Sequence, residues 1–413
     1  MTHDTGRAHQ ATYRNLLGVG EFRIIGAAHA VSMLGDAVGG VAVTVLVFEQ
    51  TSSPLLAAVG FSLIFLPHLF GGVVVPGLMN RFRPRPLAVF CNGISAVLVG
   101  LLVIPGLPAW LILAVMFLVG TLAPVIVGIR SAVLPDLLGD GPLFVLGRGV
   151  IRLISQSSLV VGYLLGGALL LFLQPRGALL ANAVSFAAAA LLLQFGTRDR
   201  GWDGTTSPSE EDSSGSLHEV WRHPATRRLL LIGWLTPSFA IASEALAAPY
   251  VVGLGRPERD LALLLSASAG GMVVSDLVAT RLVPTSLQRQ LVLPGAVLLC
   301  APLVFFVFTP PLPVAMTLMF VSGLGLAYNA GLDSLLADRT PPRLLRRTLA
   351  YQYVFLLGVQ GIAAVAWGGL GEVVLPSTVI AGAGCIGVVV VVALTLGIHR
   401  PSLQNSLSKE NSG

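Results

Sequence analysis

The stretch Ser207-Pro-Ser-Glu-Glu-Asp-Ser-Ser-Gly215 lies near the middle of a 413-residue chain that is otherwise mostly apolar. It belongs to a longer polar region, 198–224, whose serine, proline and acidic content is typical of a linker. The apolar sequence on each side is long enough for six membrane crossings at about 20 residues per crossing. The linker therefore predicts two halves of six helices each.

Composition supports a polytopic membrane protein. Hydrophobic residues make up 54% of the chain and charged residues only 11%, whereas soluble domains carry about 25% charged residues. The apolar runs are about twice the length of barrel strands and do not alternate in polarity. We expect twelve helices, at 23–48, 54–79, 86–105, 108–129, 144–173, 177–196, 227–252, 260–283, 290–309, 312–335, 347–371 and 375–398.

The basic residues predict the orientation of the chain. One set of loops holds Arg176, Arg256 and Arg259, and the other set, with both termini, holds the remaining 22 of the 25 basic residues. Cytoplasmic loops carry the excess of arginine and lysine, so both termini are expected in the cytoplasm. The expected location is the inner or plasma membrane. The predicted divisions are an N-terminal segment 1–22, a six-helix bundle 23–197, a linker 198–226, a second bundle 227–398 and a tail 399–413.

The two halves contain similar features. Ser131-Ala-Val-Leu-Pro-Asp136 follows the fourth helix, and Ser334-Leu-Leu-Ala-Asp338 follows the tenth. The first helix of each half carries one acid within its apolar run, Asp36 and Glu244 respectively. Repeated bundles are typical of secondary transporters, whose binding sites lie near mid-membrane.

The chain resembles the major facilitator superfamily, and within it the twelve-helix drug-exporter branch of macrolide efflux pumps and enterobactin exporters. The likeness rests on Phe22-Arg23, on Ser32-Met-Leu-Gly-Asp36 within the first helix, on Thr51-Ser-Ser-Pro54-Leu before the second, and on Arg130-Ser131 with Leu134-Pro135-Asp136. It implies an all-α membrane protein with twelve transmembrane helices in two pseudo-symmetric bundles, and export of a small compound.

Two family motifs are altered. The loop between the second and third helices reads Gly77-Leu-Met-Asn80-Arg81-Phe-Arg-Pro-Arg85, with Asn80 where the family has an acid that helps to latch the two halves. The antiporter stretch reads Gly162-Tyr163-Leu-Leu-Gly-Gly167, with Tyr163 in place of a proline. Small residues there still allow close helix packing. The change at Asn80 affects the expected latch between the halves, and the change at Tyr163 affects the expected antiporter motif.

Asp36 is the main candidate for proton coupling. It lies about 13 residues, or roughly 20 Å, into the first helix, where a charge costs about 2.5–3.5 kcal/mol on insertion scales. Intramembrane acids of this kind act as proton carriers or bind cationic substrates; the alternative is a hydrogen bond to a nearby serine or threonine. Glu244 is the second candidate, with a hydrated outer vestibule as its alternative.

Other residues have weaker patterns. Arginines 130, 148 and 152 could pair with Asp136 or Asp140, gate the inner mouth, or only anchor the topology. The full set of expected gate and motif residues is Gly77, Asn80, Arg81, Arg85, Arg130, Asp136, Arg148, Arg152, Asp276 and Asp333. The polar and aromatic residues expected along a substrate cavity are Ser32, Gln156, Trp234, Tyr328, Asn329, Gln352 and Gln360. His29 and His68 are expected to make interhelical hydrogen bonds.

Several function classes are excluded. Lys409 is the only lysine and follows no glycine loop, so the chain has no ATP-binding P-loop. It carries no zinc-protease or serine-hydrolase motif, and we expect no enzyme activity, cofactor or metal. The net charge of +5 comes from loop arginines and does not indicate nucleic acid.

We expect a monomeric secondary transporter whose partners are a small-molecule substrate, protons and the lipid bilayer. The predicted substrate is a small amphipathic or lipophilic compound, such as a drug, an antibiotic or a siderophore-like molecule, exported by proton antiport. One alternative is a lysophospholipid or lipid flippase of the same fold. Another is a membrane-embedded protein without transport activity.

Overall fold

Proline determines where many of the helices begin. The computed structural model describes residues 12–63, 65–69, 81–139, 141–199 and 217–399. Six of the described helices have a proline as their first residue, at Pro54, Pro84, Pro142, Pro224, Pro342 and Pro376. Proline is favoured there because its φ angle is already helical and its missing N–H would have no partner. Some helices therefore start earlier than their apolar runs.

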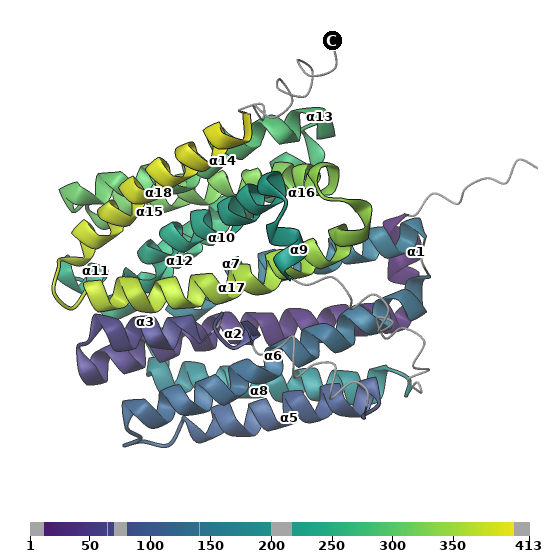
Figure 1. Ribbon diagram of the computed structural model, residues 1–413. Coiled ribbons are helices and arrows are strands. Elements are labelled where there is room, and N and C mark those ends of the chain that lie inside the picture. Colours follow the sequence, from purple (N-terminus) through teal and green to yellow (C-terminus); the bar gives the residue numbers. More distant parts are fainter. Residues whose placement is uncertain (1–11, 64, 70–80, 140, 200–216, 400–413) are drawn as a thin grey trace, which may run out of the picture. The chain divides into compact units, whose positions relative to one another are not determined.

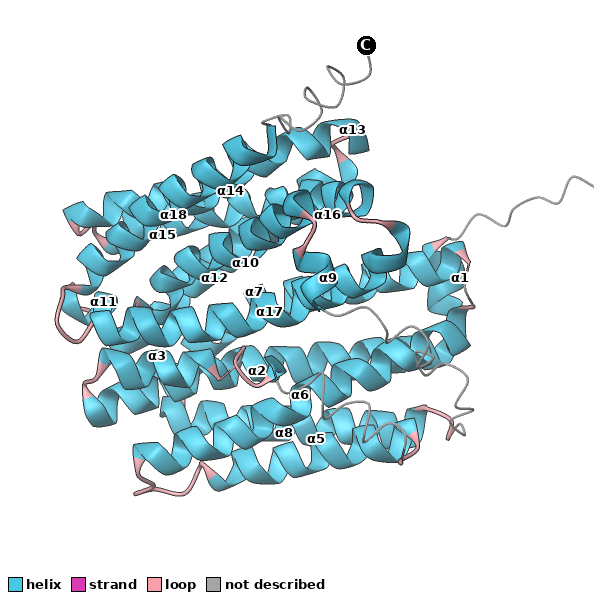
Figure 2. Ribbon diagram, in the orientation of Figure 1, coloured by secondary structure: helices cyan, strands magenta, loops and turns pink. Residues whose placement is uncertain are grey.

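The described residues form helices joined by turns, with no strand among them (Figure 2). Ten of these helices are long and apolar enough to cross a membrane, or eleven if α10 (Pro224–Ala245) and α11 (Ala247–Gly253), bent by 42°, form one span. The predicted segment 54–79 is described only in part, as α3 (Pro54–Ser62) and a few residues beyond it. The expectation of an all-α protein with many membrane-length helices is confirmed.

Contacts divide the chain into two compact units. The first takes in the described residues of Met1–Gly39 and Phe70–Ser207. Its helices are α1 (Tyr13–Gly18), the first part of α2 (Gly20–Thr51), α5 (Pro84–Leu101), α6 (Ala109–Leu138), α7 (Pro142–Phe172) and α8 (Gln174–Gly196). Helices α5 and α8 run side by side (Figure 1).

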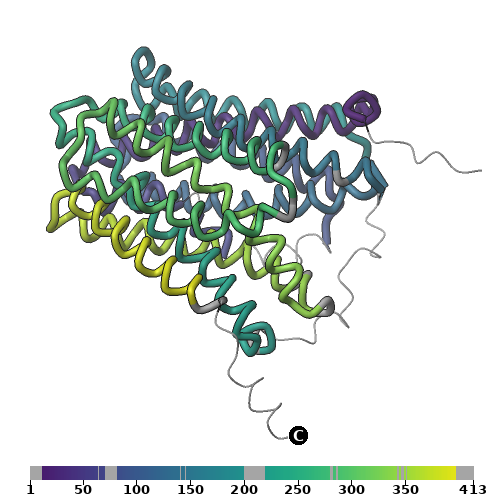
Figure 3. Tube along the Cα trace, turned by 90° about the horizontal axis from the view of Figure 1, so that it is seen from above, coloured from purple at the N-terminus to yellow at the C-terminus, as the bar shows by residue number. Residues whose placement is uncertain are grey.

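The second unit takes in the described residues of Gly40–Leu69 and Pro208–Gly413, so it includes the end of α2 and all of α3. Its other helices, which Figure 3 follows along the Cα trace, are α9 (Leu217–Trp221), α10, α11, α12 (Leu261–Arg281), α13 (Thr285–Gln288), α14 (Val292–Cys300), α15 (Leu312–Leu324), α16 (Tyr328–Arg339), α17 (Pro342–Leu370) and α18 (Pro376–His399). Four short 3₁₀ segments, Glu258–Asp260, Arg289–Leu291, Ala301–Phe308 and Gly325–Ala327, join or extend them.

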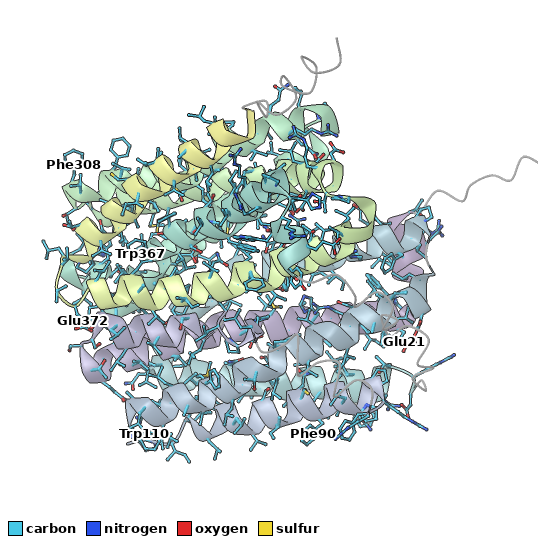
Figure 4. All side chains as sticks on the ribbon, viewed as in Figure 1. Glu21, Phe90, Trp110, Phe308, Trp367 and Glu372 are labelled. Atoms are coloured by element: carbon cyan, nitrogen blue, oxygen red, sulfur yellow. The ribbon has the colours of Figure 1, made fainter. Side chains whose placement is uncertain are left out.

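Helix α5 shows how the helices divide between protein and lipid. Phe90, Val97 and Leu101 are exposed by 62%, 63% and 47% and follow one stripe of the helix, while Cys91, Asn92 and Val99 on the other side are buried. Phe90 projects away from the ribbon, as do Trp110 and Phe308 (Figure 4). Exposed apolar stripes of this kind are suited to a lipid environment, and tryptophan is enriched at its border.

In the second unit, a carboxylate joins the turn after α17 to the start of α3. Glu372 accepts hydrogen bonds from the Ser53 hydroxyl and, at 3.0 Å, from the Leu55 N–H. The α3 N-terminus has unpaired N–H groups and a partial positive charge, which favour a carboxylate. The bonds from Ser53 and Leu55 lower the pKa of Glu372, which lies outside the membrane-spanning helices.

We predict that Glu372→Gln lowers the apparent melting temperature slightly at neutral pH and has no effect in acid. A lowered folded-state pKa contributes stability above the unfolded-state pKa, and this contribution is lost as the pH falls through the folded-state value. Melting curves in detergent across acidic to neutral pH would measure it. In a Ser53→Ala background the Gln substitution should cost less, because one donor is already absent; a difference that is independent of pH would contradict the assignment.

Candidate functional site

A cavity of about 80 Å³ opens within the first unit, between α2, α5, α6 and α8. It has room for several water molecules. Its walls combine apolar side chains with a few polar and charged groups, and they are formed by Glu21, Ile25, Ala28, His29, Ser32, Pro84, Arg85, Ala88, Asn92, Ile126, Ile129, Arg130, Val133, Ala189, Leu193, Thr197 and Arg198. Pockets that bind small molecules commonly have this mixture.

Asp36 continues the cavity-lining face of α2. Ile25, His29 and Ser32 on this face are spaced by three or four residues, and Asp36 lies one turn beyond Ser32. The carboxylate is half-buried, and it has no hydrogen bond or ion pair with any other described residue. Such a group is free to gain or lose a proton without breaking a salt bridge.

Close packing holds α2 on both sides of Asp36. A Cβ at Gly35 would lie 1.8 Å from the Ser185 Oγ on α8. On α7, a Cβ at Gly162 would lie 2.6 Å from the Ala37 Cβ and 3.0 Å from the Leu34 carbonyl oxygen on α2. Gly162 therefore contributes close contact with the helix that carries Asp36, even though Tyr163 replaces the family's proline.

His29 joins three helices of the first unit. Arg130 on α6 bonds to the His29 Nδ1, and the His29 Nε2 lies 2.7 Å from the Ser155 Oγ on α7. Because arginine can only donate, Nδ1 must accept and Nε2 carries the proton. Ser155 in turn donates to the Ile151 carbonyl at 3.0 Å. The geometry thus assigns a neutral histidine within a directed chain of hydrogen bonds, in keeping with the interhelical bond expected for His29.

Other first-unit residues that were singled out from the sequence are not part of this series of hydrogen bonds. Arg148 and Arg152 are exposed, and the Arg148 guanidinium lies 5.9 Å from the Phe144 ring centre. Asp136 is exposed and forms no ion pair with another described residue. Arg81 is exposed and Gln156 is half-buried. Gly77, Asn80 and Asp140 lie outside the described residues.

In the second unit, Glu244 on α10 accepts a hydrogen bond from the Ser268 Oγ on α12 at 2.8 Å. Unlike Asp36, this half-buried acid has a partner. Trp234 is buried, donates to the Gln352 carbonyl oxygen at 3.2 Å, and stacks on Trp221. It therefore packs inside the unit.

The other second-unit candidates have differing surroundings. Gln352 is buried, and its side-chain Oε1 has no hydrogen-bond partner among the described residues. Tyr328 is 1% exposed and packs into the apolar core around α10, α14 and α16. Asn329, Gln360 and Asp276 are half-buried, and Asp333 is exposed.

Sequence reasoning missed several charged and polar groups. Arg289 pairs with Asp338 at 2.6 Å in the second unit, and Arg83 pairs with Asp199 at 2.9 Å in the first. Asn92 is buried in the cavity wall, although an asparagine within an apolar run was a signal that could have identified it. Glu21 and Arg198 meet only because the ends of α2 and α8 lie together, where the Arg198 N–H donates to Glu21 at 3.0 Å.

Comparison with known proteins identifies the family. The family described as the Major Facilitator Superfamily matches residues 25–327, which is more than half of the chain. The chain belongs to the Major Facilitator Superfamily. Membership makes it a multi-pass membrane transporter of a small molecule and not an enzyme. Among curated proteins, none matches this chain.

Solved structures of this superfamily fold are similar along nearly the whole chain. The nucleoside transporter NupG is 11% identical over 92% of this chain and 100% of its own, with a TM-score of 0.71. A POT family transporter in complex with 5-aminolevulinic acid is 11% identical over 95% and 99%, with a TM-score of 0.67. A bacterial homolog of the human lysosomal transporter Spinster is 15% identical over 94% and 95%, with a TM-score of 0.64. At these identities the likeness supports the fold alone.

We predict opposite effects for two glycine substitutions on α7 of this superfamily member. Gly162→Ala should destabilise by about 1–3 kcal/mol, since the new methyl group would overpack against α2. Gly149→Ala should be neutral or stabilising by up to about 1 kcal/mol, because a Cβ there meets nothing within 4 Å. Melting temperatures in detergent would distinguish them, and equal shifts would show that α2 and α7 are not in close contact at Gly162.

We predict that His29→Phe is more harmful than His29→Gln. Phenylalanine leaves Arg130 and Ser155 without this partner, at a cost of about 1–3 kcal/mol for a lost buried hydrogen bond, whereas glutamine keeps one acceptor and one donor. The readout is again the melting temperature of the purified protein. If the two variants melt together, the histidine fills space and the hydrogen-bond chain adds nothing.

Proposed function

We propose that this transporter exports a small amphipathic or lipophilic compound, of the drug, antibiotic or siderophore-like kind, by proton antiport, with Asp36 as the protonation site. The observation that carries the proposal is the Asp36 carboxylate, half-buried on an apolar helix, one turn beyond a cavity-lining serine and without an ion-pair partner. A carboxylate kept in that setting has a cost, which a coupling role would explain.

The energy for export would come from the proton gradient. The chain has no P-loop lysine, and each proton moved across the membrane supplies about 2.3 kcal/mol per 100 mV. In the proposed cycle the halves 23–197 and 227–398, with both termini in the cytoplasm, expose the substrate path to each side of the membrane in turn.

Different roles are proposed for the two intramembrane acids. Glu244 is the weaker candidate for coupling because Ser268 already holds its carboxylate. Ser32 lines the first-unit cavity, and its place beside Asp36 on α2 favours a substrate role. Gln352, with an unpaired amide oxygen, is the strongest substrate-contact candidate in the second unit; Gln156, Asn329 and Gln360 follow. Trp234 and Tyr328, both packed in the core of that unit, would act by shaping it.

The arginine and acid residues proposed as inner gates form a third group. Arg85 and Arg130 line the first-unit cavity, which supports a role in gating access to it. Arg81, Arg148, Arg152, Asp136, Asp276 and Asp333 remain proposals as changing ion pairs, as does the motif loop that includes Gly77 and Asn80. We propose the pair Arg289–Asp338 as a further inner-face pair of this type.

We predict that Asp36→Asn abolishes substrate-linked proton movement. The amide has nearly the same shape but cannot carry the proton. Proteoliposomes loaded with a pH-sensitive dye would be given erythromycin, ethidium or chloramphenicol in turn, and internal pH and compound flux would be recorded together. Asp199→Asn, which changes an exposed acid in the same unit, is the matched control and should behave as wild type.

Four outcomes decide between the proposals. Coupled flux that is unchanged in Asp36→Asn removes Asp36 from the mechanism, and loss in Glu244→Gln instead assigns coupling to that acid. Transport that proceeds without proton movement in the wild type contradicts antiport. Movement of a fluorescent lysophospholipid between leaflets, with none of the three compounds transported, would favour the flippase alternative.

A further inference from the structure

The first-unit cavity has a charge bias that the transport proposal does not use. Three arginines, Arg85, Arg130 and Arg198, contribute to its walls, and Glu21 is the one acid among the lining residues described. Since His29 is neutral in its hydrogen-bond chain, the lining carries an excess of positive charge. Most of the remaining wall is apolar. These properties suit an amphipathic anion.

Two polar atoms at the cavity have no partner among the described residues. One is the Nε of Arg85, whose terminal nitrogen already donates to the Gln194 carbonyl on α8. The other is the Oδ1 of Asn92, a residue only 1% exposed, whose Nδ2 donates to the Ala88 carbonyl at 2.8 Å. Buried polar groups are nearly always satisfied by protein, water or ligand. Two residues of the cavity wall thus each hold a buried, unpaired polar atom, a donor on Arg85 and an acceptor on Asn92.

The two groups lie at different depths. Arg85 is in the first turn of α5, at the end of the unit where Glu21 lies in the first turn of α2 and Arg198 follows α8 (Figure 4 labels Glu21). Asn92 is seven residues further along α5, roughly 10 Å along the helix axis. A ligand with an acid at one end and a hydroxyl or amine at the other would match this arrangement.

We propose that this cavity is a binding site for a small amphipathic acid that also carries a hydrogen-bond donor. The carboxylate accepts from the Arg85 Nε and lies near Arg198, the apolar body packs between α2, α5, α6 and α8, and the donor group bonds to the Asn92 Oδ1. The site is a property of the first unit and goes beyond the proposed proton exchange. Its acid-binding end is roughly 20 Å along α2 from Asp36.

The test uses 4-hydroxybenzoate, which has an acid, one aromatic ring and a donor at the opposite end. Equilibrium dialysis of the purified full chain with radiolabelled compound would measure binding, with benzoate and 4-hydroxybenzamide as competitors. We expect saturable binding of the acid, weaker competition by benzoate because it lacks the donor, and the weakest by the amide because it lacks the charge. An amide that competes as well as the acid overturns the proposal.

Matched variants locate the site. Arg85→Ala should weaken binding roughly tenfold or more, as expected for a lost hydrogen bond to a charged group, and Arg85→Lys should restore part of it. Arg83→Ala removes an equal charge two residues away, from a side chain that pairs with Asp199 and does not line the cavity, and should leave affinity unchanged. Equal affinity in Arg85→Ala and Arg83→Ala overturns the assignment. In Asn92→Leu, 4-hydroxybenzoate and benzoate should bind alike, and a preserved preference would contradict the role of the amide.

An anionic lipid headgroup offers the same acid chemistry, so the binding is repeated in nanodiscs. Affinity should be equal in phosphatidylcholine and phosphatidylglycerol; loss in phosphatidylglycerol that depends on Arg85 would make the headgroup the occupant and overturn the small-acid proposal. If 4-hydroxybenzoate fails to bind while Asp36-dependent proton exchange with other compounds persists, only this inference fails. If it binds while exchange is absent, only the proposed transport mechanism fails.

Discussion

A carboxylate on an apolar helix is the constraint that organises this account. Placing Asp36 within α2 costs free energy in a bilayer, and within the described part of the chain no cation or hydrogen-bond donor compensates it. Close contacts at Gly35 and Gly162 hold α2 against α8 and α7 on either side of Asp36. The fold therefore keeps an isolated acid in a fixed position, as a site of reversible protonation requires.

The cavity beside α2 runs from Ser32, one turn before Asp36, to Glu21 near the start of the helix. Its deep wall is organised by the hydrogen bonds from Arg130 through His29 to Ser155, which neutralise no charge but orient three helices. Its other end, beside Glu21, is lined by Arg85 and Arg198, and the Arg85 Nε has no hydrogen-bond partner among the described residues. A charged group can thus be held at the end of the cavity without approaching Asp36. In the two proposals, proton coupling at Asp36 on α2 and binding of an acid at Arg85 on α5 therefore use different parts of the first unit.

Much of the fold could be predicted from sequence because a bilayer allows few solutions. Long apolar runs must be helical there, so the helical segments followed from composition, and prolines such as Pro142 and Pro342 sharpened the helix starts. The assignment of helices to the two compact units was harder to predict. Residues 40–69 belong to the second unit, because α3 packs on α17 and Ser53 and Leu55 bond to Glu372. Those contacts join residues more than 300 positions apart, and no local pattern encodes them.

The site was only partly predictable for the same reason. Asp36, Ser32, Arg85 and Arg130 were identified because polar residues in apolar runs, or in a family motif, are conspicuous. Glu244 differs from Asp36 in having a hydrogen-bond partner. This partner is Ser268, which lies 24 positions after Glu244 in the sequence. Tyr328 and Trp234 were expected to line a substrate path, yet both pack in an apolar core, because an aromatic residue with a polar tip is compatible with either setting.

The most direct measurement of the central claim is infrared difference spectroscopy of the reconstituted protein, following the C=O stretch of protonated carboxyl groups while the bulk pH is changed. We expect one component of the pH-dependent carboxyl band in the wild type to be missing in Asp36→Asn and to persist in Asp199→Asn. A spectrum of Asp36→Asn that retains the full pH-dependent band would show that the proton is carried elsewhere and would contradict the account.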